Sequence, residues 1–421
     1  MVAQPQVTIK LGVKPNDKDK NGKTYTGDST GSKSVIIKVT RSFYPLDQGS
    51  TANFLKYTHE DKDNTGRISP FKLKAVKDGT PIPINGIPPN GASIPNVTSV
   101  SAYYWKYKPK TVLILGVTAT GTKSETTYYV KNLLFSGGTK WAQAGTGNLD
   151  DEELENVLDQ QNCYFNNAVT MNVYFTKSQI YTSGNNKYCC YYHEGTSGKG
   201  RVSVERKTVS CTSHISTRLT VYKHEFTFGD SSRLSGIKYY DGRGQRRRIK
   251  ITGLVLPTRD SVKVYVFYCN GKNPVLIYIR SRGIATGWYK KNDNSSSNGK
   301  DEKWEKVQDW LPNIIPNNFK TTDHGKFDEL VKALQKAGGC KKSGICPPDP
   351  PPQQRQQEAS PAEGSPTSDA LADGGASIFA GLGIWSISGI SSGTLAGAGG
   401  LTGFGWWMFK RSRGDPWIRQ I

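Results

Sequence analysis

Acidic residues are scarce in this sequence. Its 421 residues include 35 Asp and Glu against 56 Lys and Arg, which gives a formal net charge of +21 at pH 7. A positive excess of this size attracts anionic surfaces such as sulfated glycans, sialylated glycoproteins, phospholipid head groups or nucleic acid. A well-solvated Lys-rich surface that binds nothing in particular would have the same composition. The charge therefore indicates the sign of a partner and leaves its identity open.

Several signatures of catalysis are also missing. The sequence has no His-Glu-x-x-His spacing, no Walker loop and no dinucleotide fingerprint. We therefore predict that the protein is not an enzyme and uses no cofactor. His59 and His224 each precede a Glu at matching positions of two similar segments. We interpret these histidines as a repeated structural contact rather than as a reactive site.

No two cysteines have the Cys-x-x-Cys spacing of zinc and thioredoxin-type sites, so the sequence predicts no metal. The seven cysteines all lie between Cys163 and Cys346. This clustering favours disulfides, with Cys189 and Cys190 bonded to different partners among Cys163, Cys211 and Cys269. The alternative is a set of reduced thiols in the cytosol, because residues 1–10 lack the apolar core of a signal peptide.

One loop has oxygen-bearing residues at a spacing similar to that of a calcium loop. Asp17, Asp19 and Asn21 precede Gly22, and Asp28 stands at the twelfth position. The flanking sequence lacks the two helices that such a site needs. We therefore favour a hairpin turn at Asn21-Gly22 over a calcium site.

Alternating apolar residues predict an all-β fold with short helices. Strands are expected over residues 7–13, 34–39, 71–76, 100–107, 111–117 and 125–130. Asp78-Gly79 and Asn85-Gly86 are typical turn pairs. Residues 149–161 differ, because acidic residues fill the first turn and Leu154, Val157 and Leu158 share one face. This pattern predicts an amphipathic helix.

The same order of motifs occurs twice. Tyr57-Thr-His59-Glu60 returns as Tyr222-Lys-His224-Glu225, and Val112-Leu-Ile114 returns as Val275-Leu-Ile277. Because the matched pieces keep their order, we predict two tandem copies of one module. The expected modules are residues 1–163 and 164–340, each an antiparallel β-sandwich-like unit that ends in a short helix.

The composition changes after residue 340. Residues 341–383 are rich in Pro, Gln and Ser and predict a disordered stalk. Residues 384–409 contain no Asp, Glu, Lys or Arg and have Trp385 and Trp406 near their ends, which predicts one transmembrane helix. The basic tail at residues 410–421 is then cytoplasmic. A glycine-rich buried or disordered segment is the alternative.

Two candidate contact regions follow from residue spacing. Gly389, Gly393 and Gly397 recur every fourth residue and predict a packing face through which two membrane helices could form a homodimer. The densest basic cluster predicts an anionic-ligand patch, and it comprises Arg243, Arg246, Arg247, Arg248 and Lys250. A solvated strand edge is the other interpretation of this cluster, and it is the one that we favour. The sequence contains no RNA-binding signature or zinc finger, so nucleic acid is a minor alternative.

Residues 410–421 and parts of the repeats resemble a known family. The segment Gly414-Asp-Pro-Trp-Ile-Arg-Gln-Ile421 follows a glycine-rich apolar run, and Asn273-Pro-Val-Leu-Ile-Tyr278 and Trp304 occur in the second repeat. These features resemble a large family of predicted membrane proteins of the piroplasm parasite Theileria equi, some labelled hypothetical or complement component 3 CVF-like. The resemblance implies a surface-exposed, antigenic parasite protein with no established activity. We do not transfer the complement label, because the chain has no thioester Cys-Gly-Glu-Gln motif.

These patterns lead to one functional prediction and one alternative. We predict a non-enzymatic, single-pass membrane protein of the cell surface, with both modules outside. Its basic modules would bind an anionic host or parasite partner. The alternative is a tail-anchored protein whose modules face the cytosol and bind acidic lipid or nucleic acid.

Overall fold

The structure is a computed structural model that describes most of residues 4–340. It leaves out residues 20, 28–33, 64, 81, 132–139, 146–147, 183–186, 194–199, 212–217, 228–230, 270, 293–299, 312–313, 317–320, 323, 339 and 341–421. The expected stalk, transmembrane segment and tail, with Gly389, Gly393 and Gly397, therefore lie outside the described residues. Within the described residues, no helix has both the length and the apolar character needed to cross a membrane.

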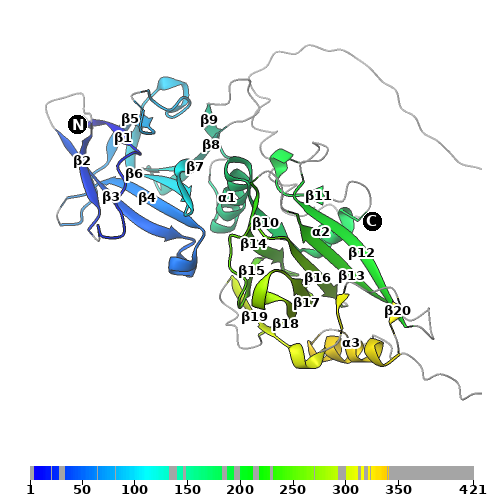
Figure 1. Cartoon of the computed structure of the whole chain (residues 1–421). Coiled ribbons are helices and arrows are strands. Elements are labelled where there is room, and N and C mark those ends of the chain that lie inside the picture. The colour runs from blue at the N-terminus through cyan, green and yellow to red at the C-terminus, as the bar shows by residue number, and fades with distance from the viewer. Residues whose placement is uncertain are drawn as a thin grey trace, which may run out of the picture.

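The described chain is mostly β-sheet with few helices, so the predicted all-β class is confirmed (Figure 1). The first sheet contains β1 (Gln6–Lys10), β2 (Lys23–Gly27), β3 (Val35–Tyr44), β4 (Phe54–Asp61), β5 (Phe71–Lys77), β6 (Ile94–Trp105), β7 (Lys108–Thr120), β8 (Ser124–Lys131) and β9 (Trp141–Gln143). The 3-10 helices η1 (Leu46–Thr51) and η2 (Pro89–Gly91) lie in its connections. Each strand expected from residues 7–130 is present, and β6 begins six residues earlier than its alternation predicts, at Ile94 rather than residue 100.

The second sheet begins after α1 (Asp151–Asn166). Its strands are β10 (Ala168–Asn172), β11 (Lys187–Tyr188), β12 (Val202–Cys211), β13 (Arg218–Phe226), β14 (Arg233–Tyr240), β15 (Arg246–Ile251), β16 (Val262–Tyr268), β17 (Pro274–Arg280), β18 (Gly287–Lys291), β19 (Asp301–Lys306) and β20 (Thr321–Thr322). The helices are α2 (Phe175–Ile180), η3 (Tyr191–His193), η4 (Gly283–Ala285), η5 (Gln308–Trp310) and α3 (His324–Lys336). We call the units built on the two sheets module 1 and module 2.

The two sheets share a pairing scheme. In module 1 the order is β2-β3-β4-β6-β7-β8-β9, and in module 2 the strands β11-β12-β13-β16-β17-β18-β19 follow each other in the same way. Each module also pairs its first strand in parallel with a later one, β1 with β5 and β10 with β14, and both pairs shift register at the same point. These parallel pairs differ from the purely antiparallel arrangement that we expected. They form because the three strands between the partners allow the chain to return in its original direction.

Each module contains a contact between a tyrosine and a buried histidine, and the two contacts have the same geometry. In module 1, Tyr25 accepts a hydrogen bond from the Lys10 backbone N–H (3.0 Å) and lies 3.3 Å from His59 Nδ1. In module 2, Tyr188 accepts from the Asn172 N–H (3.0 Å) and lies 3.1 Å from His224 Nδ1. Both histidines are fully buried, and burial lowers the pKa of each to about 3. The interpretation of His59 and His224 as a repeated structural contact is therefore confirmed.

Helix α1 lies between the two sheets (Figure 1). Its start agrees with the predicted helix, because Asp150 caps it and forms a reciprocal capping box with Glu153. It ends at Asn166, so the expected boundary after residue 163 falls inside the helix. Leu154 and Leu158 pack into the core of module 1 beside Phe54 and Trp105. The apolar face of α1 therefore completes the core of module 1, and the opposite face of the helix lies toward module 2.

Helix α3 occupies the equivalent place in module 2. Leu330 and Leu334 are buried in its core, in the same spacing as Leu154 and Leu158 of α1. The positions that follow these leucines differ, since Glu155 and Asp159 of α1 correspond to Val331 and Gln335 of α3. Lys332 and Lys336 are exposed on α3. The closing helices thus share an apolar face but differ in charge.

Candidate anion-binding site

The predicted basic cluster lies on β15 and the turn before it, and the structure overturns part of that prediction. Strand β15 pairs with β14 on one side and with β19 on the other, so it is not the solvated edge that we considered. Arg246 and Arg248 are buried, with 4% and 7% of their surface exposed. Both side chains point toward α1, where acidic partners surround them. These two residues are therefore part of the interior rather than of a free surface patch.

Glu155 of α1 is the centre of this buried network. Its carboxylate lies 2.8 Å from Arg246 Nε and 2.7 Å from Arg248 Nη1, and only 1% of the residue is exposed. Arg248 also forms ion pairs with Asp301 and, across the module boundary, with Asp47 of η1 (2.6 Å). Buried charges persist only when paired and hydrogen-bonded. The cluster therefore joins the two modules.

Asp159 extends the network by one helical turn. It lies 2.9 Å from Arg246 Nη1 and 3.0 Å from Lys238 Nζ. Burial alone would raise the pKa of this carboxyl, but the two cations lower it to about 2. Burial alone would lower the pKa of Arg246, but the carboxylates of Asp159 and Glu155 raise it, so this guanidinium stays charged.

The other three predicted residues lie nearer the surface. Arg243 is exposed in the β14–β15 turn. Arg247 pairs with Asp241 at 2.8 Å, and Lys250 lies 3.7 Å from Asp301. Only Arg243 is thus a fully exposed member of the predicted patch. The sequence identified the basic residues of this cluster. It did not reveal that the carboxylates of Asp and Glu side chains already form ion pairs with most of them.

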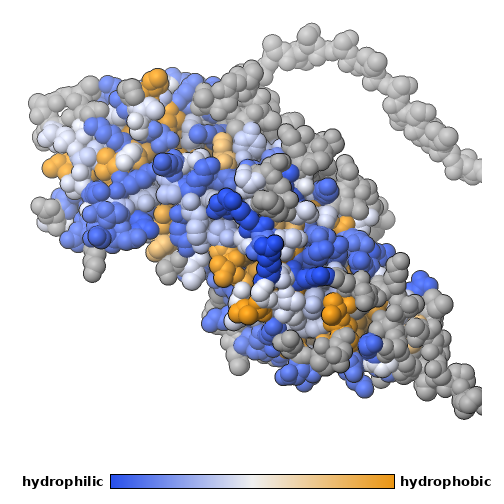
Figure 2. Space-filling model, viewed as in Figure 1, coloured by the Kyte–Doolittle hydropathy of each residue, from blue (hydrophilic) through white to orange (hydrophobic). Residues whose placement is uncertain are grey.

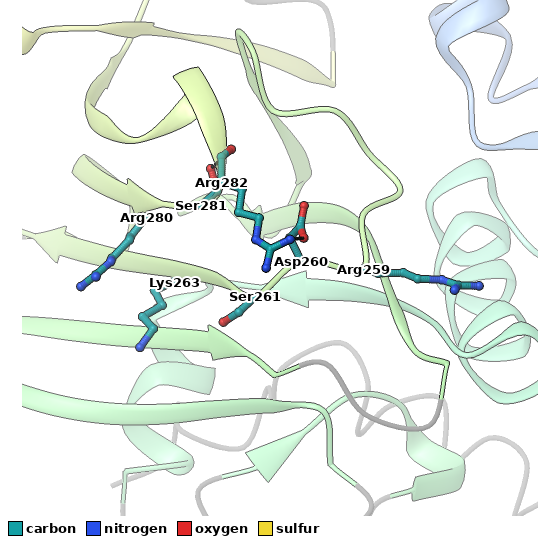
Figure 3. A pocket seen from close by; sticks show the side chains of 7 residues that line it. All are labelled: Arg259, Asp260, Ser261, Lys263, Arg280, Ser281 and Arg282. Atoms are coloured by element: carbon teal, nitrogen blue, oxygen red, sulfur yellow. Dashed lines mark hydrogen bonds and ion pairs between the residues drawn. The ribbon is translucent and has the colours of Figure 1, made fainter.

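A different basic surface, which we call the β16–β17 hollow, offers exposed cations. It has a volume of about 600 Å³ and is lined by Arg259, Asp260, Ser261, Lys263, Arg280, Ser281 and Arg282. Lys263 and Arg280 stand opposite each other in the antiparallel β16–β17 pair. Figure 3 shows these two side chains on one side of the hollow, while Arg259 extends toward the opposite side. The lining carries four cations and one carboxylate.

The charges of the hollow are only partly compensated. Asp260 lies 3.4 Å from Arg282, and Glu225 of β13 lies 2.8 Å from Lys263. Arg259 and Arg280 are exposed and have no carboxylate partner among the described residues. Two unpaired guanidinium groups beside two serine hydroxyls form donors suited to a sulfate, carboxylate or phosphate group. A volume of this size lies within the usual range of small-molecule binding sites.

The rest of the visible surface is largely polar. Figure 2 shows a largely hydrophilic face with small, separate hydrophobic patches. The most exposed large apolar residues, Val255 (80%), Ile284 (78%), Leu46 (74%) and Ile82 (72%), come from different connections.

The β16–β17 hollow was not predicted from the sequence, because Arg259 and Arg280 are 21 residues apart. The signal that could have found it is the antiparallel pairing of two strands with Arg-Asp-Ser at the start of one and Arg-Ser-Arg at the end of the other.

The cysteines are arranged differently from our prediction. Cys269 forms a disulfide with Cys340, not with Cys189 or Cys190. Cys163, Cys189 and Cys190 gather with His193 in a group of the kind that could hold a metal ion. Cys-x-x-Cys spacing does not reveal this group, because the chain brings together residues 26 positions apart. In the loop considered for calcium, Asp17 pairs with Arg41, Asp19 pairs with Lys23 (3.2 Å) and a strand follows Gly22.

Comparisons of the chain with family models, with curated proteins and with solved structures find no match.

Proposed function

We propose that this chain is a non-enzymatic, membrane-anchored binding protein whose module 2 contacts a polyanionic partner through the β16–β17 hollow. The observation that carries the proposal is the pair of exposed, unpaired guanidinium groups of Arg259 and Arg280. Arg280 ends β17, and Arg259 follows Thr258, whose backbone is hydrogen-bonded to that of Leu234. The backbone at both positions is therefore held in place before a ligand binds, which lowers the entropic cost of binding. A sulfated glycan suits this surface best, because it offers repeated anions along an extended chain that can reach both arginines.

The membrane anchor in this proposal rests on residues 384–409, which are uncharged and followed by a basic tail. Two β-sandwich-like modules, held outside by the stalk at residues 341–383, would place the hollow away from the bilayer. The resemblance to piroplasm membrane proteins supports surface display and antigenicity. A dimer through Gly389, Gly393 and Gly397 would double the number of hollows and raise avidity for a repeating polymer.

Charge reversal in the hollow is expected to weaken binding to heparin, used as a sulfated probe. The variant Arg259→Glu, Arg280→Glu, Arg282→Glu should bind immobilised heparin at least about tenfold more weakly than the native chain, a loss of about 1.4 kcal/mol. The three side chains are exposed, so the change should leave folding intact. Surface plasmon resonance at several salt concentrations measures both the affinity and its salt dependence.

A matched control separates this site from the general charge of the protein. Lys74, Lys108 and Lys110 are exposed on module 1, and replacing all three with Glu changes the net charge by the same amount. Affinity for heparin should fall much less in this control. Equal losses in the two variants would show that heparin responds to net charge alone and would reject the hollow as a site.

Surface display has its own test. An antibody against the modules should stain intact cells that express the full-length chain, and permeabilisation should add little signal. Signal only after permeabilisation would instead favour the tail-anchored alternative, in which the modules face the cytosol and bind acidic lipid or nucleic acid. One observation favours that alternative, because Cys163 and Cys190 carry reduced thiols, which are typical of the cytosol.

A further inference from the structure

Four potential metal ligands meet where α1 ends. Cys163 lies in the last turn of α1, Cys189 and Cys190 directly follow β11, and His193 ends η3. One ligand atom from each residue lies within 4.8 Å of the other three. Cys163 and Cys190 are buried, while Cys189 and His193 are half-buried. Two separate elements of the fold therefore bring three thiols and one imidazole together.

The backbone of η3 directs the histidine at the sulfurs. The His193 N–H donates to the Cys190 carbonyl at 3.0 Å and closes a turn over Cys190-Tyr191-Tyr192-His193. As a result, His193 Nδ1 lies 3.2 Å from both Cys189 Sγ and Cys190 Sγ, and 3.7 Å from Cys163 Sγ. Spacing of a cysteine and a histidine three positions apart occurs in zinc-binding turns. The local sequence thus presents three of the four ligands from five consecutive residues.

These distances fit one tetrahedral ion. Zinc bonds to sulfur at about 2.3 Å and to imidazole nitrogen at about 2.0 Å, so the edges of a Cys₃His tetrahedron measure roughly 3.5–3.8 Å. The observed nitrogen–sulfur distances of 3.2–3.7 Å need only small adjustments to match. All four ligands come from protein, which is the arrangement of a closed structural site rather than of a catalytic one.

Neighbouring contacts hold the ligands in place. The His193 ring stacks on Tyr164 with ring centroids 5.9 Å apart. The Tyr191 N–H donates to the Gln160 side chain at 2.6 Å, and the Gln161 amide donates to the Tyr192 hydroxyl. Gln160, Gln161 and Tyr164 all belong to α1. Such supporting contacts orient the ligands before the ion arrives.

We propose that Cys163, Cys189, Cys190 and His193 bind one zinc ion that fastens the segment after β11 to the end of α1. On binding, the three thiols release their protons to solvent and the imidazole binds through Nδ1, with no change in oxidation state. Module 1 has no equivalent of this site, because every cysteine of the chain lies at or after Cys163. Zinc would thereby stabilise module 2 at the helix that links it to module 1.

The test uses the full-length chain purified in detergent, with zinc measured by elemental mass spectrometry after passage over a chelating resin. The native chain should retain about one zinc per chain. Cys190→Ser and His193→Ala should each abolish this stoichiometric zinc. The control Cys269→Ser, Cys340→Ser removes two cysteines outside the cluster and should keep it.

A second measurement does not depend on how the variants fold. Cobalt added to the metal-free native chain should produce the intense visible d–d bands of a tetrahedral thiolate centre. Zinc-free native protein together with missing cobalt bands would overturn the proposal. A disulfide among Cys163, Cys189 and Cys190 in protein isolated from cells would overturn it as well, and so would full zinc retention in both ligand variants.

Discussion

Glu155→Ala will lower the free energy of unfolding of the full-length chain by about 3–5 kcal/mol. The substitution removes the carboxylate that lies 2.8 Å from Arg246 and 2.7 Å from Arg248, in a place that is 1% exposed. The two guanidinium groups would remain buried with reduced compensation, and this uncompensated charge accounts for most of the loss. Chemical denaturation followed by tryptophan fluorescence measures the change.

Two further variants test the cause. Glu125→Ala removes an exposed carboxylate of β8 and should change stability by less than about 0.5 kcal/mol. Adding Arg246→Met and Arg248→Met to Glu155→Ala should recover part of the lost stability, because it removes the two cations that shared Glu155 while Asp159 keeps its ion pair with Lys238. The triple variant could instead be less stable than Glu155→Ala, by the sum of the losses in unfolding free energy that the two arginine substitutions cause. In that case lost packing, and not buried charge, explains the effect.

Lowering the pH from 7 to 5 will destabilise each module by about 2 kcal/mol through its buried histidine. His59 and His224 have pKa values of about 3 in the folded state, because burial disfavours the charged form, with Lys14 adding to the effect at His59. In the unfolded chain a histidine pKa is about 6.5. Below pH 6.5 the histidine therefore binds a proton in the unfolded state but stays neutral in the folded state. This contribution to stability is present above pH 6.5 and is lost as the pH falls toward 3.

The measurement compares the pH dependence of unfolding in the native chain with that of His59→Gln, His224→Gln. Glutamine does not titrate, so the variant should lose about 4 kcal/mol less than the native chain between pH 7 and pH 5. The difference between the two pH dependences is the quantity of interest, because the variant also loses stability at pH 7. Identical pH dependences would mean that the histidines titrate normally and are reached by water in the folded protein.

Much of the fold could be predicted from local patterns. Alternation identified β1, β3, β5, β6, β7 and β8 of module 1 but missed β2, β4 and β9. The recurrence of Tyr-x-His-Glu marked equivalent positions in the two copies, where His59 and His224 are both buried. The helix start could be predicted because Asp150 and Glu153 form a capping box within one turn of chain. These features depend on residues that are close in sequence, so periodicity and spacing are enough to reveal them.

The partners of charged residues could not be predicted in the same way. Arg246 and Arg248 form a dense basic run in the sequence, but their carboxylates lie about 90 positions earlier on α1. Periodicity places Glu155 and Asp159 on the polar side of that helix and does not say what covers them. The β16–β17 hollow escaped prediction for a related reason, since the register of two strands decides that Lys263 faces Arg280.

The difference between α1 and α3 means that the two closing helices cannot exchange roles. If α3 stood between the modules in place of α1, it would present Val331 and Gln335 to Arg246 and Arg248, where α1 presents Glu155 and Asp159. Neither residue carries a negative charge, so the two guanidinium groups would stay buried without a carboxylate from that helix. The junction between the modules therefore accepts only one of the two helices.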